Sequence, residues 1–422
     1  MTGRTRSAPT KLSRRSVLSL LGATALASGG AGALSRDSHA SSDQTAAKTG
    51  PPPTALLPGG AFDRYVSGLA AQDLFSGNVL LARHGAPVLV RSFQDADKAK
   101  SIPNQAGTIF ALDSITKFFT GLAVTQLAAQ DKVDFSATMG NYLDGFPSDI
   151  ANVVTVHDLL THTAGFPASL QGMGGNWTTP REAFNGMLAL LRNQGLATPP
   201  GTKYAYSNAN YFLAGAILAS ASGQDLWDYV PQHVFAPARM SSTAFYSDEQ
   251  WLTDVRFAHI YGPAVDGGQR QDLTSHAGNG PNGWDGAAGA FSTAPDLLRF
   301  ARALADGTLL PPAWAELRAS GRYPVNPAQK DPDAPTTSKS FMIGYGSDER
   351  ITGGGQPAYG HTGGLQIHSS GSSQPGGAST ALTIYPDLDV VAIVLCNYSL
   401  SSIGGIGAFL AEQDRIITQG AS

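Results

Sequence analysis

The tetrapeptide Ser-Ile-Thr-Lys at residues 114–117 opens the segment that decides the fold, SITKFFTGLAVTQLAAQ at residues 114–130. Apolar residues recur in this segment three and four positions apart, a spacing typical of an amphipathic helix. Residues three apart on a helix are surface neighbours, so a helix here places the amine of Lys117 beside the hydroxyl of Ser114. A serine that acts as a nucleophile needs such a neighbour. The apolar face comprises Ile115, Phe118, Phe119, Leu122, Ala123 and Leu127.

Two later tripeptides complete a set that a Ser-x-x-Lys pair alone cannot define, because such a pair often occurs by chance. They are Tyr206-Ser207-Asn208 and His361-Thr362-Gly363. Three longer stretches accompany them: VHDLLTHTAG at 156–165, PGTKYAYSN at 200–208 and GAAGAFSTAPDL at 286–297. Joint coincidence is a poor explanation for so many segments in one order.

In identity and order these segments resemble the penicillin-recognising serine hydrolases, from about Phe62 to about Phe409. The tyrosine form of the second motif is similar to the branch that contains class C β-lactamases, DD-carboxypeptidases, D-aminopeptidases and family VIII esterases. The resemblance implies a β-lactamase/transpeptidase-like fold. It also implies that the nucleophile helix lies where two lobes meet.

The hydrophobic pattern indicates an α/β protein of the α+β type. Strands are expected near both ends of the chain, with helices between them, which favours one antiparallel sheet built from the two termini and flanked by helices. The sheet lobe would comprise about 60–134 and 286–418, and a mostly helical lobe about 135–285. The expected strands are 78–83, 87–93, 378–385 and 390–397; the expected helices begin near Ala61 and cover 210–220, 224–230, 295–306 and 403–418, with a further start at the capping sequence TPRE, residues 179–182.

The first 40 residues are interpreted as a twin-arginine signal peptide, because SRRSVL at 13–18 precedes a short apolar stretch. We therefore expect a secreted or extracytoplasmic protein with no membrane span in the mature chain. Residues 41–59 are rich in Ser, Ala, Thr and Pro and predict a flexible linker. The linker contains Lys48-Thr49-Gly50, which we reject as the third motif because it precedes the serine.

Composition narrows the class of protein. Hydrophobic residues make up 42% of the chain and charged residues 14%, as in a globular protein. Removing residues 1–40, which carry six basic and one acidic residue, would take the net charge from −4 to −9, so nucleic acid is not an expected partner.

The single cysteine, Cys396, excludes an intrachain disulfide and lies in an apolar run, which indicates a buried structural thiol. His157 and His162 fit a structural turn better than a metal site, and no cofactor or metal is expected.

The motifs supply the parts that acyl transfer requires. Ser114 is the candidate nucleophile, and its own backbone N–H, at a helix start, can bind an oxyanion. Lys117 and Tyr206 share the role of base, and the sequence leaves open which of them takes the serine proton. A free tyrosine has a pKa of ~10, so a phenolate near neutral pH needs nearby cations. Asn208 can hold Lys117 and a substrate amide.

The third motif bears on the substrate. Thr362 can donate a hydrogen bond to a substrate carboxylate or amide, and the resemblance implies that the N–H of Gly364, after Gly363, is the second oxyanion donor. The class C β-lactamases carry lysine at the position of His361, whereas histidine is similar to the DD-carboxypeptidase and D-aminopeptidase types. Histidine is only partly charged near neutral pH, so carboxylate anchoring is expected to be weak or pH dependent. Arg350 could assist, although an exposed loop arginine is the simpler interpretation.

Asp113 stands where the resemblance leads us to expect a small residue. At a helix N-terminus it is most simply a cap or a partner of the helix dipole. It could instead pair with Lys117 and hold the amine protonated. Gly364 likewise has no side chain where relatives often have Ser or Thr.

The sequence predicts an exported serine hydrolase that forms an acyl-enzyme on Ser114. The expected substrate is a D-amino-acid peptide, cleaved as a DD-carboxypeptidase or D-aminopeptidase would cleave it. Enzymatic alternatives are a family VIII carboxylesterase and a β-lactamase. An alternative of another class is a non-catalytic peptidoglycan- or penicillin-binding protein, which Asp113 leaves open. The oligomeric state does not follow from the sequence.

Overall fold

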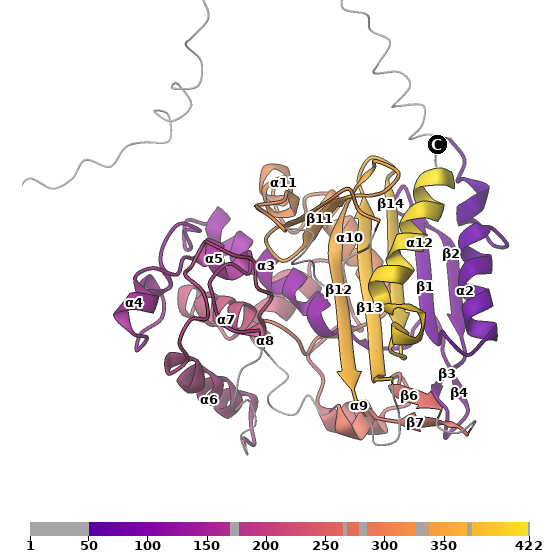
Figure 1. The fold of residues 1–422 in the computed structure, drawn as a ribbon, viewed down its shortest axis with the longest axis horizontal. Helices are drawn as coiled ribbons and strands as arrows, with labels where there is room; N and C mark the ends of the chain where they lie inside the picture. Colours follow the sequence, from indigo (N-terminus) through magenta and orange to yellow (C-terminus); the bar gives the residue numbers. More distant parts are fainter. Residues whose placement is uncertain are drawn as a thin grey trace, which may run out of the picture. The chain divides into compact units, whose positions relative to one another are not determined.

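The computed structural model describes residues 50–168, 177–264, 268–277, 285–325, 335, 337–368 and 374–420. A large antiparallel sheet runs through the molecule in the strand order β2-β1-β14-β13-β12-β11-β10-β9 (Figure 1). The N-terminal strand β1 pairs with the C-terminal strand β14, so the two ends of the chain build one sheet, as the sequence predicted. These strands are β1 (Gly77–Arg83), β2 (Ala86–Phe93), β9 (Tyr323–Pro324), β10 (Ser340–Ile343), β11 (Asp348–Ile351), β12 (Pro357–Ile367), β13 (Gly376–Tyr385) and β14 (Val390–Cys396).

The sheet separates two hydrophobic cores. Successive side chains of a strand point to opposite faces, and β1 is buried along its whole length. Val79 and Leu81 belong to the core under α2 (Ala61–Ala71) and α12 (Gly405–Gly420), the indigo and yellow helices that lie side by side in Figure 1. Leu80 and Ala82 belong to the opposite core, with α3 (Thr116–Ala129) and α10 (Ala294–Ala305).

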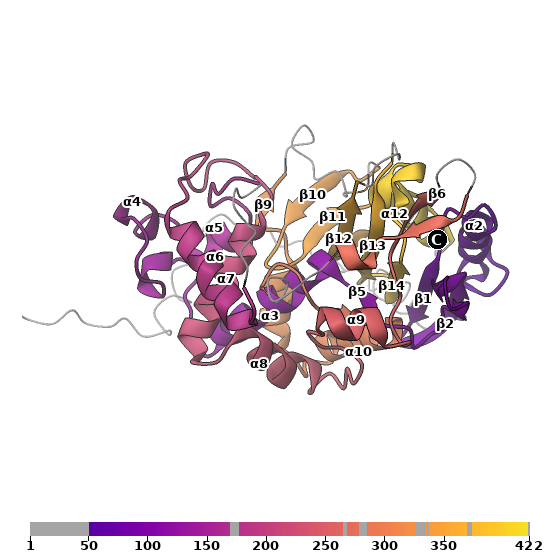
Figure 2. The ribbon, with the colours of Figure 1, turned by 90° about the horizontal axis from the view of Figure 1, so that it is seen from below.

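The helices between residues 148 and 230 gather at the end of the sheet away from α2 and α12, and α3 lies between them and the strands (Figures 1 and 2). The sequence predicted one apolar face for α3, but residues 116–125 are all buried. A helix enclosed by two layers has no face left for water. The other helices are α4 (Ser148–Ala151), α5 (Val156–Leu160), α6 (Pro180–Arg192), α7 (Asn208–Ser222), α8 (Leu226–Val230), α9 (Asp248–Thr253) and α11 (Pro312–Ala319).

Most of the expected elements occur within a few residues of their predicted ends. At α6, Thr179 is the predicted N-cap and accepts a hydrogen bond from the N–H of Glu182. Cys396 is fully buried in β14, and burial raises the pKa of its thiol to about 11, which confirms a structural thiol. Among the described residues, no helix combines the length and the apolar character that crossing a membrane requires.

Two segments differ from the expectation. Thr54–Leu56 forms a 3₁₀ helix, and Leu56 is fully buried in the core of α2 and α12, so the folded part begins within the range predicted as linker. Strands β6 (Tyr261–Ala264) and β7 (Arg270–Asp272) lie in the range predicted as mostly helical, and β6 pairs with β13. The proposed signal peptide and Lys48-Thr49 lie outside the described residues. Short strands are β3 (Asp95–Asp97), β4 (Ile102–Pro103), β5 (Phe110–Ala111) and β8 (Phe291–Ser292).

Candidate active site

The turn that carries Ser114 is fastened to the sheet. Ser114 lies in the 3₁₀ turn Asp113–Ile115, which leads directly into α3 and packs against β12. The hydroxyl of Thr380, on β13, donates a 3.1 Å hydrogen bond to the carbonyl of Leu112. A Cβ at Gly363 would lie 2.1 Å from that same carbonyl oxygen, so only glycine lets β12 approach this closely. The third motif therefore fixes the position of the serine.

The structure brings three predicted catalytic groups together at one oxygen. The Oγ of Ser114 lies 2.9 Å from Nζ of Lys117 and 2.8 Å from the hydroxyl of Tyr206. The lysine comes from the next turn of the same helix, whereas the tyrosine lies 92 residues further along the chain. Both neighbours are within the distance at which a proton can pass.

The environment of Lys117 suits a charged ammonium. Its side chain is completely buried, and Nζ donates hydrogen bonds to Oγ of Ser114 at 2.9 Å, Oδ1 of Asn208 at 2.8 Å and the carbonyl of Ala287 at 2.9 Å. An ammonium has three N–H donors and no acceptor, so three oxygens satisfy it completely. The arrangement favours protonated Lys117, and then Tyr206 is the neighbour able to act as base.

Asp285 aims the carbonyl of Ala287 at the lysine. Its Oδ1 accepts hydrogen bonds from the N–H groups of Ala287 and Ala288 at 2.7 and 2.9 Å, which closes a tight turn. Burial raises the pKa of Asp285 to about 6, although the two N–H groups and Lys117 oppose the shift. Sequence reasoning missed this residue; its position directly before the segment at 286–297 was the available signal.

His162 supports Tyr206 from behind. The two rings lie 4.4 Å apart between centroids and 31° from parallel. Nδ1 of His162 accepts a hydrogen bond from the N–H of Ser207, and burial, followed by Lys117, holds the pKa of this histidine well below its usual range. Nδ1 of His157 instead contacts the hydroxyl of Tyr345. The predicted structural turn is therefore present, but sequence reasoning missed that it positions the tyrosine.

His361 lies inside the site and is neutral. It is buried on β12, and its Nδ1–H donates to the carbonyl of Thr362 at 2.5 Å. Burial lowers the pKa of His361 to about 3, with a further contribution from Lys117. The expectation of a partly charged histidine is wrong for this site, because the sequence could not show its burial. Lys117, not His361, supplies the positive charge beside Tyr206, at 4.9 Å from the ring centroid.

Beyond His361, strand β12 presents one edge to the nucleophile. Strand β13 pairs with β12 from Tyr359 to Ile367, whereas β11 pairs with it only over residues 357–360 of the described chain. Thr362 lies opposite Ala381 and Gly364 opposite Ser379 in this ladder. The remaining edge faces the turn of Ser114, which is where the second oxyanion donor is expected.

Asp113 is not a helix cap. No side chain caps either the 3₁₀ turn or α3, and Oδ2 of Asp113 is buried with no hydrogen-bond partner among the described residues. Its backbone is left-handed, with φ of 48°. Burial raises the pKa of its carboxyl to about 7, against the opposing influence of Lys117. The carboxyl is therefore largely protonated below neutral pH.

Arg350 is neither an exposed loop residue nor a substrate anchor. It lies buried on β11, and both its Nε and Nη2 donate to the carboxylate of Asp414 on α12, at 3.0 and 2.9 Å. The carboxylate of Asp414 neutralises its charge in a structural ion pair on the α12 side of the sheet. Among the described residues, no group of three or more His, Cys, Asp or Glu side chains could hold a metal ion.

The comparisons with known proteins bear on the family of the chain. The Beta-lactamase family model matches residues 62–405. Penicillin-binding protein 4* of Bacillus subtilis is 31% identical over 202 residues, 47% of this chain and 44% of the relative. A putative D-alanyl-D-alanine carboxypeptidase of Escherichia coli O157:H7 is 28% identical over 206 residues, 43% of this chain and 46% of the relative. The matched segments thus span less than half of these relatives.

The fold has solved counterparts. The D-amino acid amidase of Ochrobactrum anthropi SV3, complexed with L-phenylalanine amide, superposes with a TM-score of 0.66. The alignment covers 90% of this chain and 98% of the amidase at 21% identity. This likeness establishes the β-lactamase/transpeptidase-like architecture that the sequence predicted.

Proposed function

This chain belongs to the Beta-lactamase family of serine hydrolases, and we propose that it is an exported enzyme that cleaves amides of D-amino acids through an acyl-enzyme on Ser114. One observation carries the proposal: Oγ of Ser114 lies within hydrogen-bond reach of both an ammonium and a phenol. Such a pair can by itself activate a serine hydroxyl for nucleophilic attack.

The geometry supports a complete acyl-transfer cycle. Tyr206, as a phenolate stabilised by Lys117, takes the proton of Ser114 while Oγ attacks the amide carbon. The N–H groups of Ser114 and Gly364 bind the oxyanion of the tetrahedral intermediate. Tyr206 then returns the proton to the leaving amine as the C–N bond breaks. In the second half, Tyr206 takes a proton from a water that attacks the ester carbon, and it returns this proton to Oγ of Ser114 as the ester C–O bond breaks, which releases the acid and the free serine.

Neutral His361 favours substrates without a carboxylate at the leaving side. A cation at this position would hold the C-terminal carboxylate of a D-Ala-D-Ala peptide, whereas a neutral imidazole offers only a hydrogen bond. A D-aminopeptidase or amidase reaction makes no such demand. We therefore place it ahead of DD-carboxypeptidase activity, which the sequence had left level with it.

A substrate panel tests the proposal. The purified chain is assayed with the p-nitroanilides of D-alanine and L-alanine, an N-blocked D-Ala-D-Ala peptide, p-nitrophenyl acetate and a chromogenic cephalosporin. We expect the D-alanine anilide to give the highest kcat/KM, the L-enantiomer to be at least about tenfold poorer, and Ser114→Ala to abolish turnover. Preference for the blocked peptide, the ester or the cephalosporin would assign carboxypeptidase, esterase or β-lactamase activity instead.

A covalent label separates an enzyme from a binding protein. Incubation with a fluorescent penicillin should acylate Ser114, as intact mass and peptide mapping would show, and Ser114→Ala should remain unlabelled. Absence of both labelling and turnover in a folded chain would favour a non-catalytic penicillin- or peptidoglycan-binding role.

Export is tested separately. The proposed signal peptide predicts that replacing Arg14 and Arg15 together by lysine retains the protein in the producing cell. Export of the double variant at the original level would contradict a twin-arginine signal.

A further inference from the structure

Arg318 is a buried cation without a carboxylate partner in the described part of the chain. Only 1% of the residue is exposed, and its guanidinium lies 4.4 Å from the ring centroid of Phe118. Nη1 makes two long hydrogen bonds, 3.3 Å to the carbonyl of Tyr345 and 3.4 Å to Oγ of Ser347. Nε is buried and has no hydrogen-bond partner among the described residues. Buried charges are ordinarily paired, so this one is available for an anion.

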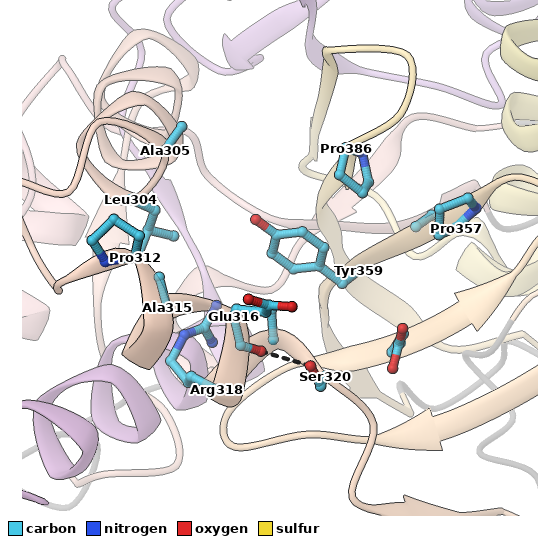
Figure 3. A pocket seen from close by; sticks show the side chains of 13 residues that line it. Leu304, Ala305, Pro312, Ala315, Glu316, Arg318, Ser320, Pro357, Tyr359 and Pro386 are labelled. Carbon is cyan, nitrogen blue, oxygen red and sulfur yellow. Dashed lines mark hydrogen bonds between the residues drawn. The ribbon is translucent and has the colours of Figure 1, made fainter. Parts of the chain in front are cut away.

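Arg318 lines a pocket of about 440 Å³ between α11, the end of α10 and strand β12. Figure 3 shows Arg318 and Glu316 on one side of the pocket, with Tyr359 and Pro357 on the other. The walls are otherwise apolar and formed by Leu304, Ala305, Pro312, Ala315, Ala319, Ala358 and Pro386. Such a mixture of apolar walls and a few polar groups is typical of small-molecule sites.

This pocket is distinct from the catalytic site. On α3, Lys117 reaches Ser114, whereas the ring of the adjacent Phe118 packs against the guanidinium of Arg318, which lines the pocket. None of the lining residues belongs to α3 or to the catalytic set, so an occupant would reach the helix of the nucleophile only through Arg318. The inference does not depend on the reaction proposed above.

We propose that this pocket binds a small organic monocarboxylate on the guanidinium of Arg318. A planar guanidinium with an unused N–H matches a carboxylate in geometry and charge. The carboxylates of Glu316 and Glu349 also line the pocket and would repel a multiply charged anion such as phosphate. The apolar walls accommodate a short alkyl body. Burial lowers the pKa of Arg318 to about 10, which still leaves it charged at neutral pH.

The proposal is tested by calorimetry with propionate, its neutral isostere propionamide, and inorganic phosphate. Ser114→Ala serves as the background, so that no turnover interferes. We expect saturable binding of propionate and at least about tenfold weaker binding in Arg318→Met, because a charge-assisted hydrogen bond is lost. Equal binding of propionamide, tighter binding of phosphate, or an unchanged Kd in folded Arg318→Met would overturn the proposal.

Because Arg318 is buried, Arg318→Met could fail to fold, and a surface variant keeps the test decisive. Glu316 is exposed at the pocket, so Glu316→Gln should fold normally and tighten propionate binding by about 2- to 5-fold through loss of repulsion. Arg322, an exposed arginine four residues from Arg318, provides the matched control, and Arg322→Gln should leave the Kd unchanged. An effect of Arg322→Gln equal to that of Glu316→Gln, or no effect of Glu316→Gln, would contradict a carboxylate in this pocket.

Discussion

Two buried cations, Lys117 and Arg350, lie on opposite sides of the sheet and are treated differently by their surroundings. Arg350 meets a carboxylate: Asp414 accepts from two of its nitrogens, and Tyr385 donates to the same carboxylate at 2.6 Å. Lys117 meets neutral oxygens of a serine, an asparagine amide and a backbone carbonyl. Both cations are hydrogen-bonded, but Arg350 donates to a carboxylate, whereas Lys117 donates to uncharged oxygens and interacts with the carboxyls of Asp113 and Asp285 through its charge.

The difference indicates what each charge is for. Burial alone would lower the pKa of Arg350, but the carboxylate of Asp414 raises this pKa overall. The ion pair is therefore a stable structural link between β11 and α12. The positive charge of Lys117 is left to act on groups that become negative during a reaction, namely a phenolate at Tyr206 and an oxyanion at Ser114. Burying an ammonium in this way costs stability, which the site gives up for function.

The largest effect is expected from Lys117→Met. Loss of the ammonium should lower kcat/KM by about 10³- to 10⁴-fold, because it stabilises the phenolate and positions the serine. The same change should shift the Tm less than Arg350→Met does, because the cost of burying the ammonium disappears together with its three hydrogen bonds. Steady-state kinetics on the best substrate and thermal unfolding followed by circular dichroism check the two parts. Activity within tenfold of the parent would show that this cation is structural.

Arg350→Met should show the reverse pattern. It leaves the carboxylate of Asp414 buried without its cation, which should cost about 3–5 kcal/mol of unfolding free energy. The activity of the folded fraction should remain near the parent value, because the ion pair touches no reacting group. Urea unfolding measures the loss, and Arg350→Met with Asp414→Asn is the control that should recover part of it. A selective loss of kcat at full stability would break the contrast between the two cations.

Several features of this site follow from local sequence. The spacing of Ser114 and Lys117 requires only a helix, and a helix with that apolar pattern forms wherever a core can cover it. The hairpin of β1 and β2 and the capping threonine of α6 are likewise local. The position of Tyr206 followed from the resemblance alone, because no spacing rule brings together residues 92 apart.

The missed features depend on burial and on contacts between distant segments. Asp414 is 64 residues from Arg350, and no local sequence pattern predicts that the two side chains form an ion pair. His361 was expected to be partly charged because an isolated imidazole is, and only the packing around β12 makes it neutral. Asp113 lies at a helix start, as a cap would, but its backbone is left-handed and its carboxyl is buried. Protonation states and long-range contacts of this kind can be predicted only from the tertiary structure.

Asp113 is a further titratable group near Lys117, and its pH dependence sharpens the comparison of the two cations. Its native pKa of about 7 exceeds the usual value of 3.8, so between these values the folded state holds a proton that the unfolded state has lost. Stability from this group is therefore present below pH 4 and falls as the pH rises towards 7. Asp113→Asn should remove that decline and raise the unfolding free energy at pH 8 by about 3 kcal/mol, after allowance for partial exposure. The Tm values of the parent and of Asp113→Asn at pH 5 and pH 8 measure this difference. If the Tm of both proteins changed equally with pH, Asp113 would be an ordinary exposed carboxyl.

The smallest effect concerns a cation that the site lacks. His361→Lys would place an ammonium on β12 where the parent has a neutral imidazole. A substrate with a free C-terminal carboxylate should then gain roughly tenfold in kcat/KM relative to its amide, through one charged hydrogen bond. The second charge also opposes Lys117, so the amide should lose activity while the acid gains it. The ratio of the two rates for one D-Ala-D-Ala peptide and its C-terminal amide isolates this effect from any general damage, and His361→Gln, which keeps a neutral hydrogen-bonding group, should leave the ratio unchanged. An equal change in both substrates for the lysine variant would mean that His361 positions the strand and does not select the substrate.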